Sequence, residues 1–455
     1  MIIRKIAMGG GRILVKVLAT LVMVATCATT AFADIYVTPT GAGNKDGSPW
    51  ANAFAGIQAA VDFVDAAVAA DANYAIPTIR VADGTYTRVV VSRNMALDVR
   101  SENGAAATII DGFNTNRCVL CYANGFKTTP TFTGFTLRNG NVTGFSGTDS
   151  WGGGAGGGTL VDCVIEDCAA VWGGGTYKAN TQRCIIRRCR ATSAGGACAE
   201  EGTHRNTLMC QSTGTSYIIY DVTLYNCTVA DNAATSDNAI NIRNKYNCIV
   251  WGNTINGQPS AQNDPQNPKF AGDGDYRLRV GSPGIDGGDA TYSTEGYVGL
   301  TDLAGNARVQ GNAIDLGCYE GTGVEGCLVT AVAGGNGVVS PTSFFTNETM
   351  SVTITADTSV YGRPVTAWYT NGVLAASGGN SLTVVMSGNG DIEVTAMFAT
   401  YEWFVNGTTG SDSNDGSSAA TAFKTIAKAV SSAANDETIN VAPAPTRPST
   451  RRACA

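Results

Sequence analysis

The hexapeptide Cys163-Val-Ile-Glu-Asp-Cys168 recurs as Cys184-Ile-Ile-Arg-Arg-Cys189, at an offset of 21 positions. Looser copies begin at Phe135, Cys210, Cys227 and Cys248, and the last two show the same offset. Paired glycines keep the same spacing, at 153–154, 174–175 and 195–196. A fixed period of this length indicates a solenoid, in which each repeat packs mainly on its two neighbours.

The copies also show the pattern of short strands. Their first and third positions are apolar, whereas the second and fourth positions vary. This alternation is typical of a strand with one face in the core. A coil of about 21 residues with glycine-rich corners has the size of one turn of a parallel β-helix, whose coils lie about 4.8 Å apart. The sequence therefore predicts an all-β protein built on a parallel β-helix.

Stacking the coils in register predicts three pairs of opposite charges on neighbouring rungs. Asp162 would face Arg183, Glu166 would face Arg187, and Asp167 would face Arg188. Each such pair contributes roughly 0.2–1 kcal/mol to stability.

The same register predicts columns of cysteines. Cys163 would lie next to Cys184 and Cys168 next to Cys189, while Asn232 and Asn253 occupy the sixth position of later copies. Two alternatives remain open: a ladder of stacked, reduced thiols, or at least one disulfide between rungs. Cys118-Val-Leu-Cys121 has no second pair and no neighbouring histidine, so we expect it in the core of a strand rather than in a redox or zinc site.

The repeats are flanked by segments of other kinds. Asn52 is a candidate N-cap for a helix with Phe54, Ile57, Val61, Val64 and Val68 on one face, which would cover the open end of the solenoid. A second copy of this cap unit occurs near residues 403–442, with Thr421 in the place of Asn52, and no coils follow it. We therefore expect that the chain is a truncated or frame-shifted part of a longer tandem protein. The predicted organisation is a signal peptide over 1–33, the β-helix with its cap and closing segment over 34–321, a small all-β domain over 322–399, a truncated second cap over 400–443 and a disordered tail over 444–455.

Composition and the N-terminus indicate an exported protein. Arg4, Lys5, Arg12 and Lys16 precede a short apolar stretch, and Ala31-Phe-Ala33 offers a small-x-small cleavage site. Lipidation at Cys27 is the alternative. No later stretch of about 20 apolar residues exists, so no transmembrane span is expected in the mature chain. A net charge of −7 argues against nucleic acid as a partner. The single histidine, His204, excludes a multi-histidine metal site and is expected in a solvated corner between coils.

These motifs resemble the right-handed parallel β-helix proteins of the pectate-lyase-like superfamily, particularly the polymorphic outer-membrane-protein-like members. The segments Ser282-Pro-Gly-Ile-Asp286 and Ile314-Asp-Leu-Gly-Cys-Tyr-Glu320 look like the choice-of-anchor closing region attached to such β-helices. Residues 326–398 are similar to bacterial extracellular repeats found beside them. The resemblance implies a right-handed β-helix and a secreted or cell-surface bacterial protein, often adhesive or glycan-facing, and it carries no activity with it.

Three functions follow as hypotheses. We favour a noncatalytic protein that adheres to extracellular polysaccharide or to a host or neighbouring surface, with Trp151, Trp172 and Trp251 as candidate binding residues. The alternative is a polysaccharide lyase or glycoside hydrolase acting on acidic polysaccharide, for which the candidate catalytic residues and Ca²⁺ ligands are Lys178, Arg187, Arg188, Arg190, Glu166 and Asp167. The third is a structural spacer or stalk. No cofactor is expected beyond a possible Ca²⁺ ion, for which Asp286, Asp289 and Asp302 are further candidate ligands.

Overall fold

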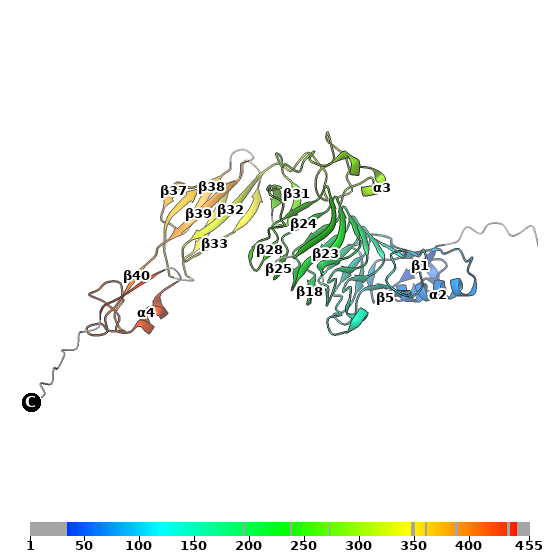
Figure 1. Cartoon of the computed structure of the whole chain (residues 1–455), viewed down its shortest axis with the longest axis horizontal. Coiled ribbons are helices and arrows are strands. Elements are labelled where there is room, and N and C mark those ends of the chain that lie inside the picture. The colour runs from blue at the N-terminus through cyan, green and yellow to red at the C-terminus, as the bar shows by residue number, and fades with distance from the viewer. Residues whose placement is uncertain are drawn as a thin grey trace, which may run out of the picture. The chain divides into compact units, whose positions relative to one another are not determined.

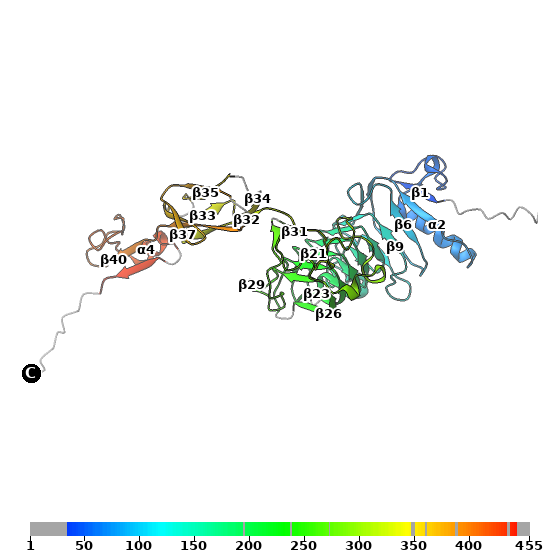
Figure 2. The same cartoon turned by 90° about the horizontal axis from the view of Figure 1, so that it is seen from above.

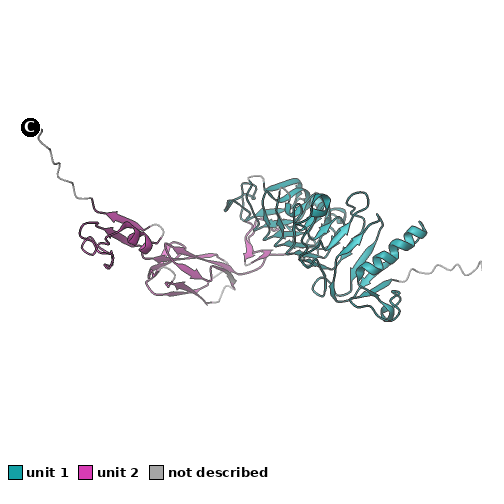
Figure 3. Cartoon of the chain, turned by 90° about the horizontal axis from the view of Figure 1, so that it is seen from below, with its two compact units in different colours: residues 1–267, 286–320 teal, residues 268–285, 321–455 magenta. Residues whose placement is uncertain are grey.

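The computed structural model describes residues 34–193, 196–236, 239–272, 274–346, 351–359, 362–386, 390–434 and 437–443 (Figure 1). The predicted signal peptide, Gly195 and the predicted tail over 444–455 lie outside the described residues. The chain divides into two compact units (Figure 3). The first contains the residues up to Asn267 together with Asp286–Glu320, and the second contains Pro268–Ile285 and the residues from Gly321 onward. The predicted closing segment is thus divided between the two units.

Three parallel sheets build the first unit. The largest has 15 strands in two arms that meet at β23 (Tyr217–Tyr225), which also pairs with β26 (Ile240–Tyr246). One arm runs β2 (Phe54–Ala55), β1 (Ile35–Thr38), β3 (Thr78–Val81), β6 (Asp98–Ser101), β9 (Thr131–Thr133), β12 (Thr159–Val161), β16 (Asn180–Gln182) and β20 (Thr203–Arg205). The other arm runs β5 (Val89–Val91), β8 (Val119–Cys121), β11 (Ala155–Gly156), β15 (Thr176–Tyr177) and β19 (Gly196–Glu200).

The two remaining sheets complete each coil. The second sheet runs β4 (Gly84–Tyr86), β7 (Thr108–Asp111), β10 (Thr136–Arg138), β13 (Val164–Glu166), β17 (Ile185–Arg187), β21 (Leu208–Cys210), β24 (Thr228–Ala230) and β27 (Ile249–Trp251). The third runs β14 (Ala169–Ala170), β18 (Arg190–Ala191), β22 (Thr213–Gly214), β25 (Ala233–Ala234), β28 (Thr254–Ile255) and the antiparallel β29 (Gln258–Pro259).

The register of two neighbouring coils confirms the parallel β-helix. Leu160 pairs with Thr181 and Ile165 pairs with Ile186, so each pair joins equivalent positions of successive repeats. The sheets on either side of this coil keep the same offset, since Ala155 pairs with Thr176 and Ala170 with Ala191. Inward-pointing Leu160, Ile165 and Ile186 are fully buried, so like side chains stack along the axis of the coil.

Single residues in the left-handed conformation turn the chain between strands. Asp162 and Arg183 both have φ of 52° at one corner, and Asp167 and Arg188 have φ of 54° and 51° at the next. Asparagine and aspartate tolerate this conformation better than other non-glycine residues. The corner before the Cys position is therefore occupied by asparagine in the later coils, at positions 206, 226 and 247.

A helix covers the N-terminal end of the stack, beside β1 and β5 (Figures 1 and 2). Helix α2 (Ile57–Ala70) buries Ile57, Val61 and Val64. The predicted N-cap at Asn52 is wrong, because the helix begins after Gly56, which has a φ of 83°. Residues 54–55 instead form β2 and occupy the edge of β1, which would otherwise be unpaired. Asn52 ends a 3₁₀ turn (Trp50–Asn52), where its side chain accepts the Asn44 N–H at 3.1 Å.

Several loops interrupt the regular coils. A 3₁₀ helix (η2, Gly147–Ser150) lies in the coil between β10 and β13. This coil is longer than its neighbours, because Leu137 pairs with Ile165 at an offset of 28 positions. The closing segment 286–320 contains a 3₁₀ turn (η3, Ala290–Tyr292) and the one-turn helix α3 (Glu295–Val298).

The second unit contains a short hairpin and two antiparallel-rich sheets. The hairpin is β30 (Phe270–Gly272) and β31 (Asp275–Leu278). One sheet runs β34 (Ser343–Thr346), β32 (Cys327–Gly334), β39 (Ile392–Phe398), β36 (Val365–Thr370) and β37 (Val373–Ser377), and the other runs β33 (Val338–Ser340), β35 (Ser351–Asp357) and β38 (Ser381–Val385). Trp368 is fully buried in their common core.

A second cap-like segment closes the described chain. Strands β40 (Glu402–Val405) and β41 (Thr438–Val441) pair in parallel beside α4 (Ile426–Ser432). Thr425 caps this helix by accepting the Lys428 N–H, so Thr421 does not hold the capping position. Glu437 pairs with Arg363 of the preceding β domain, with 2.5 Å between Oε1 and Nε.

Candidate binding site

Of the four candidate catalytic cations, Lys178, Arg187 and Arg188 lie in ion pairs, whereas Arg190 is exposed at the start of β18. The neighbouring Arg183 is paired along the rungs as well. Arg183 donates to both carboxylate oxygens of Asp162 at 2.7 and 2.8 Å. Arg187 lies 2.7 Å from Glu166. Each of these pairs joins equivalent positions of adjacent coils, so the solenoid register accounts for them.

The remaining members of this cluster are paired in the same way. Arg188 contacts Asp167 at 2.8 Å and Glu166 at 2.9 Å, and its hydrogen bonds lower the pKa of Asp167. Lys178 lies 3.2 Å from Glu201. The structure therefore brings Glu166, Asp167, Arg187 and Arg188 together, while Lys178 lies at another corner beside a different carboxylate.

The cysteine columns lie inside the coil. All twelve cysteines of the described residues are buried, and those other than Cys210 and Cys327 are free thiols. Cys184 Sγ accepts the Cys163 N–H at 3.4 Å, as expected for residues stacked on neighbouring rungs. Burial raises the pKa of Cys168, Cys184 and Cys189 well above the ordinary value. Cys118 and Cys121 are likewise buried around β8.

Asparagines continue the column in the later coils. Asn232 Nδ2 donates to Asn253 Oδ1 at 2.9 Å, and Asn253 Nδ2 donates to the Val229 carbonyl at 2.9 Å. Both side chains are buried, so these hydrogen bonds replace those lost to water.

His204 does not lie in a solvated corner, and that expectation is wrong. It is fully buried on β20, where its Nδ1 lies 2.8 Å from Thr181 Oγ1. Burial lowers its pKa to about 4, so the ring is neutral at physiological pH. The physical reason is strand alternation, which turns position 204 inward between Thr203 and Arg205.

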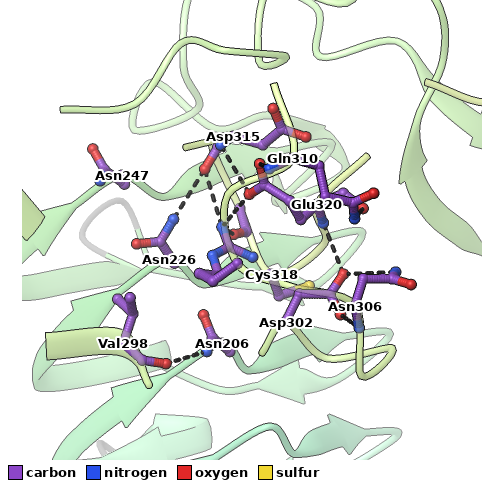
Figure 4. Close-up of polar contacts among 12 residues, drawn as sticks. Asn206, Asn226, Asn247, Val298, Asp302, Asn306, Gln310, Asp315, Cys318 and Glu320 are labelled. Atoms are coloured by element: carbon purple, nitrogen blue, oxygen red, sulfur yellow. Dashed lines mark hydrogen bonds and ion pairs between the residues drawn. The ribbon is translucent and has the colours of Figure 1, made fainter. Parts of the chain in front are cut away.

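The three candidate calcium ligands do not form one cluster. No group of three or more histidine, cysteine or acidic side chains able to hold a metal occurs among the described residues. Asp302 is buried and accepts backbone N–H groups of Asn306 and Glu320 (Figure 4). Asp289 accepts the Thr291 N–H at 2.8 Å. Asp286 accepts the Ala313 N–H at 2.9 Å.

These acids belong to a polar network that holds the closing segment on the coil, and Figure 4 shows the part of it around Asp302, Asp315 and Glu320. The corner asparagines supply its other half: Asn226 Nδ2 donates to the Asp315 carbonyl at 2.9 Å and Asn247 Nδ2 to the Asp289 carbonyl at 3.0 Å. Arg308 is buried beside Glu320, with 3.7 Å between the charged atoms. This network was not among the predictions from the sequence, although Asn226 and Asn247 recur at the 21-residue spacing of the coils.

Two of the three candidate tryptophans lie side by side on the outside of the coil. The backbones of Trp151 and Trp172 form a parallel β-bridge. Their rings are stacked, with 5.5 Å between the ring centroids and an interplanar angle of 16°. Phe126 lies on an adjacent loop, and its ring centroid is 6.3 Å from that of Trp151. The ring centroid of Tyr177 lies 4.9 Å from those of Trp151 and Phe126. The ring centroid of Tyr122 lies 5.2 Å from that of Phe126. We call these five residues the aromatic patch.

The patch is open to solvent in part. Tyr122 is 38% exposed, whereas Phe126, Trp151 and Trp172 are half-buried. Tyr177 is buried beneath them. Contiguous rings of this kind can take the apolar face of a ligand while their edges remain in water. Trp251 is not part of the patch, because it lies at the end of β27 in a different sheet.

No family model matches the sequence, and no curated protein matches it. Among solved structures the chain is similar to pectin methylesterase from carrot, with 15% sequence identity and a TM-score of 0.26. The match covers 50% of this chain and 65% of that chain, which is less than two thirds of its length. None of the helices in the described part of the chain has the length and apolarity needed to cross a membrane.

Proposed function

We propose that this chain is a secreted or cell-surface, noncatalytic β-helix protein that binds an extracellular glycan through the aromatic patch. The observation that carries the proposal is the stacked pair of Trp151 and Trp172 on the outside of the coil. The proposal includes export through residues 1–33 and the finer resemblance to bacterial surface β-helices with a closing region.

The position of the aromatic rings supports a binding role rather than a packing role. The interior of the coil is filled mainly by aliphatic side chains and cysteines, such as Ile165 and Cys189, together with the rings of Phe132 and Phe135. Trp151 and Trp172 lie outside this core and remain partly exposed. A contiguous, partly exposed apolar surface on a soluble protein commonly marks an interaction site.

The pairing of the charged residues favours binding over catalysis. Arg187 and Arg188 each contact an acidic side chain on the preceding rung, so neither is held free to remove a proton from a substrate. Glu166 accepts hydrogen bonds from both arginines. A lyase or hydrolase activity is therefore the second candidate, and a spacer without a ligand is the third.

Glycan binding can be tested on the whole exported chain by retardation in gels that contain individual polysaccharides. We expect retardation by at least one polysaccharide, and we expect Trp172→Ala and Tyr122→Ala to weaken it. Trp251→Ala is the matched control, because Trp251 is a half-buried tryptophan outside the patch. Near-ultraviolet circular dichroism checks that each variant is folded.

The same experiment separates the other two functions. Release of unsaturated or reducing sugar from any polysaccharide would overturn the noncatalytic proposal. A chain that is retarded by none of the polysaccharides would favour the spacer. Equal retardation of Trp172→Ala, Tyr122→Ala and the unmodified chain would place binding elsewhere and overturn the role of the patch.

A further inference from the structure

A pocket of about 250 Å³ opens beside the aromatic patch. It lies in the first unit, between the approaches to β5 and β8 and the loop that contains η2. Its lining residues are Arg88, Asn116, Arg117, Val142, Phe145 and Asp149. The pocket is somewhat smaller than the roughly 300–1,000 Å³ that encloses a drug-sized ligand, so its size suits a single charged group or sugar unit.

The two arginines of this pocket differ from the rung arginines in having no ionic partner. Arg183, Arg187 and Arg188 each lie within 3 Å of a carboxylate oxygen. Among the described residues, no carboxylate lies within 4.0 Å of the guanidinium nitrogens of Arg88 or Arg117.

Much of the hydrogen-bonding capacity of these arginines is unused. Arg117 is only 3% exposed, and its Nη2 donates to the carbonyls of Thr148 and Asp149. Arg88 Nη1 donates to Asn116 Oδ1 at 3.2 Å, while its buried Nε has no partner among the residues that the structure describes.

This arrangement is electrostatically costly without an anion. Burial is the main cause that lowers the pKa of Arg117 to about 10, and the nearby charge of Arg88 adds to it. Asp149, the acidic residue that lines the pocket, offsets this only in part. Desolvating a cation without a counter-ion is unfavourable, and an oxyanion would offset that cost through charge-assisted hydrogen bonds.

The pocket and the patch are joined through Gly156 on β11. A Cβ atom at this position would lie 2.8 Å from Phe126 Cε1 and 3.2 Å from Arg117 Nη1. Glycine therefore allows an aromatic ring and a guanidinium to approach the same point of the strand. The η2 segment also links the two surfaces, because Asp149 lines the pocket and Trp151 belongs to the patch.

We propose that Arg88 and Arg117 form a subsite for an oxyanion, a carboxylate or sulfate ester, carried by the glycan that stacks on the aromatic patch. This inference rests on the proposed glycan-binding function and adds the charge class of the ligand. Two guanidinium groups present planar, forked donors that match the oxygens of both anions.

Three matched oligosaccharides test the subsite: a β-1,4-linked glucan hexamer, the same hexamer oxidised to carboxylates at C6, and the same hexamer carrying 6-O-sulfate. We expect the full chain to bind at least one charged hexamer about tenfold more tightly than the neutral one, as measured by isothermal titration calorimetry. Arg88→Gln should remove that preference. Arg243→Gln is the control, because Arg243 is an exposed arginine on β26 that does not line the pocket.

Arg117 needs a second measurement, because replacing a buried arginine can prevent folding. In the unmodified chain, the Nε–Hε NMR signals of Arg88 and Arg117 should shift on addition of glucuronate or sulfate alone. Arg88→Gln should weaken the response of Arg117 to the same anion.

The outcomes distinguish the subsite from the proposed function. Equal binding of neutral and charged hexamers, with no shift of the arginine signals, would overturn the subsite and leave glycan binding standing. Arginine shifts with glucuronate or sulfate but no binding of any polysaccharide would support an oxyanion site and overturn the glycan-binding function. Retention of the charge preference in Arg88→Gln would also overturn the subsite.

Discussion

Arg183 lies one rung after Asp162 and donates to both of its carboxylate oxygens, with 2.7 Å between Nε and Oδ1 and 2.8 Å between Nη2 and Oδ2. Both residues have a φ of 52°, so they occupy the same left-handed corner of two successive coils. The pair shows how the sequence period becomes contact in space, because equivalent corners lie one strand spacing apart.

The energy of this pair is measurable by a double-mutant cycle. Asp162→Ala, Arg183→Ala and the double variant should give a coupling energy of about 0.2–1 kcal/mol, because the pair is partly solvated. Denaturant unfolding of the β-helix in low salt measures it, and high salt should reduce it. Independent effects of the two substitutions would mean that the rung pair does not contribute to stability.

The buried cysteines should be chemically inert in the folded chain. Burial raises the pKa of Cys318 to about 12 and that of Cys121 further, so almost no thiolate forms at neutral pH. Cys248 is left out of the comparison, because hydrogen bonds with Cys227 and Tyr246 outweigh the effect of burial and lower its pKa. We expect no labelling of the other cysteines between positions 118 and 327 by a thiol reagent under native conditions and full labelling in denaturant. Peptide mass spectrometry identifies the labelled positions, and rapid native labelling of Cys163 or Cys184 would contradict the buried ladder.

Glu200 should make the β-helix less stable as the pH rises. Burial on β19 raises its pKa to about 7, although the Gly196 N–H stabilises the carboxylate. In the unfolded state the pKa of this carboxyl group is about 4.5, so the folded state holds the proton more tightly. It follows that the free energy of unfolding falls as the pH rises from about 4.5 to about 7.

Replacing this carboxyl group removes the dependence. Glu200→Gln should increase the free energy of unfolding at pH 8 by roughly 1–3 kcal/mol and have little effect at pH 4. The exposed Glu295 provides the control variant, Glu295→Gln. Parallel stability–pH curves for Glu200→Gln and the unmodified chain would be incompatible with a neutral, buried Glu200.

Asn226 should contribute to stability in two separable ways. Its φ of 47° is unfavourable for alanine, and its Nδ2 holds the Asp315 carbonyl of the closing segment. Asn226→Ala should cost about 2–4 kcal/mol, whereas Asn226→Gly keeps the backbone conformation and should cost about 1–2 kcal/mol. Thermal and denaturant unfolding measure both, and equal losses would show that the backbone conformation contributes nothing.

Regions of constant coil length were predictable in detail from the sequence. Between residues 155 and 191 every paired position follows the same repeat, so partners come directly from counting. Where the coil length changes, counting fails. Asp111 pairs with Arg138 across a coil of different length, with 2.8 Å between Oδ2 and Nε. The 21-residue repeat does not predict this pair.

Features that depend on the ends and edges of the solenoid were also beyond the sequence. Asn52 is a favourable N-cap residue, yet pairing of Phe54 with Val37 at the sheet edge delays the helix to Ile57. His204 is polar and follows a glycine-containing turn, yet the strand places its side chain in the core.

By itself, the sequence determined the repeat, the strand alternation and hence the parallel β-helix, because stacking in register follows from a constant period. Only the tertiary structure decided which side chains meet on the outer surface. Arg88 and Arg117 lie in different coils, and Phe126 and Trp151 lie in loops of unequal length, so no spacing along the chain links them. They become neighbours because the coil places successive turns side by side and loops fold back on the rungs that carry them.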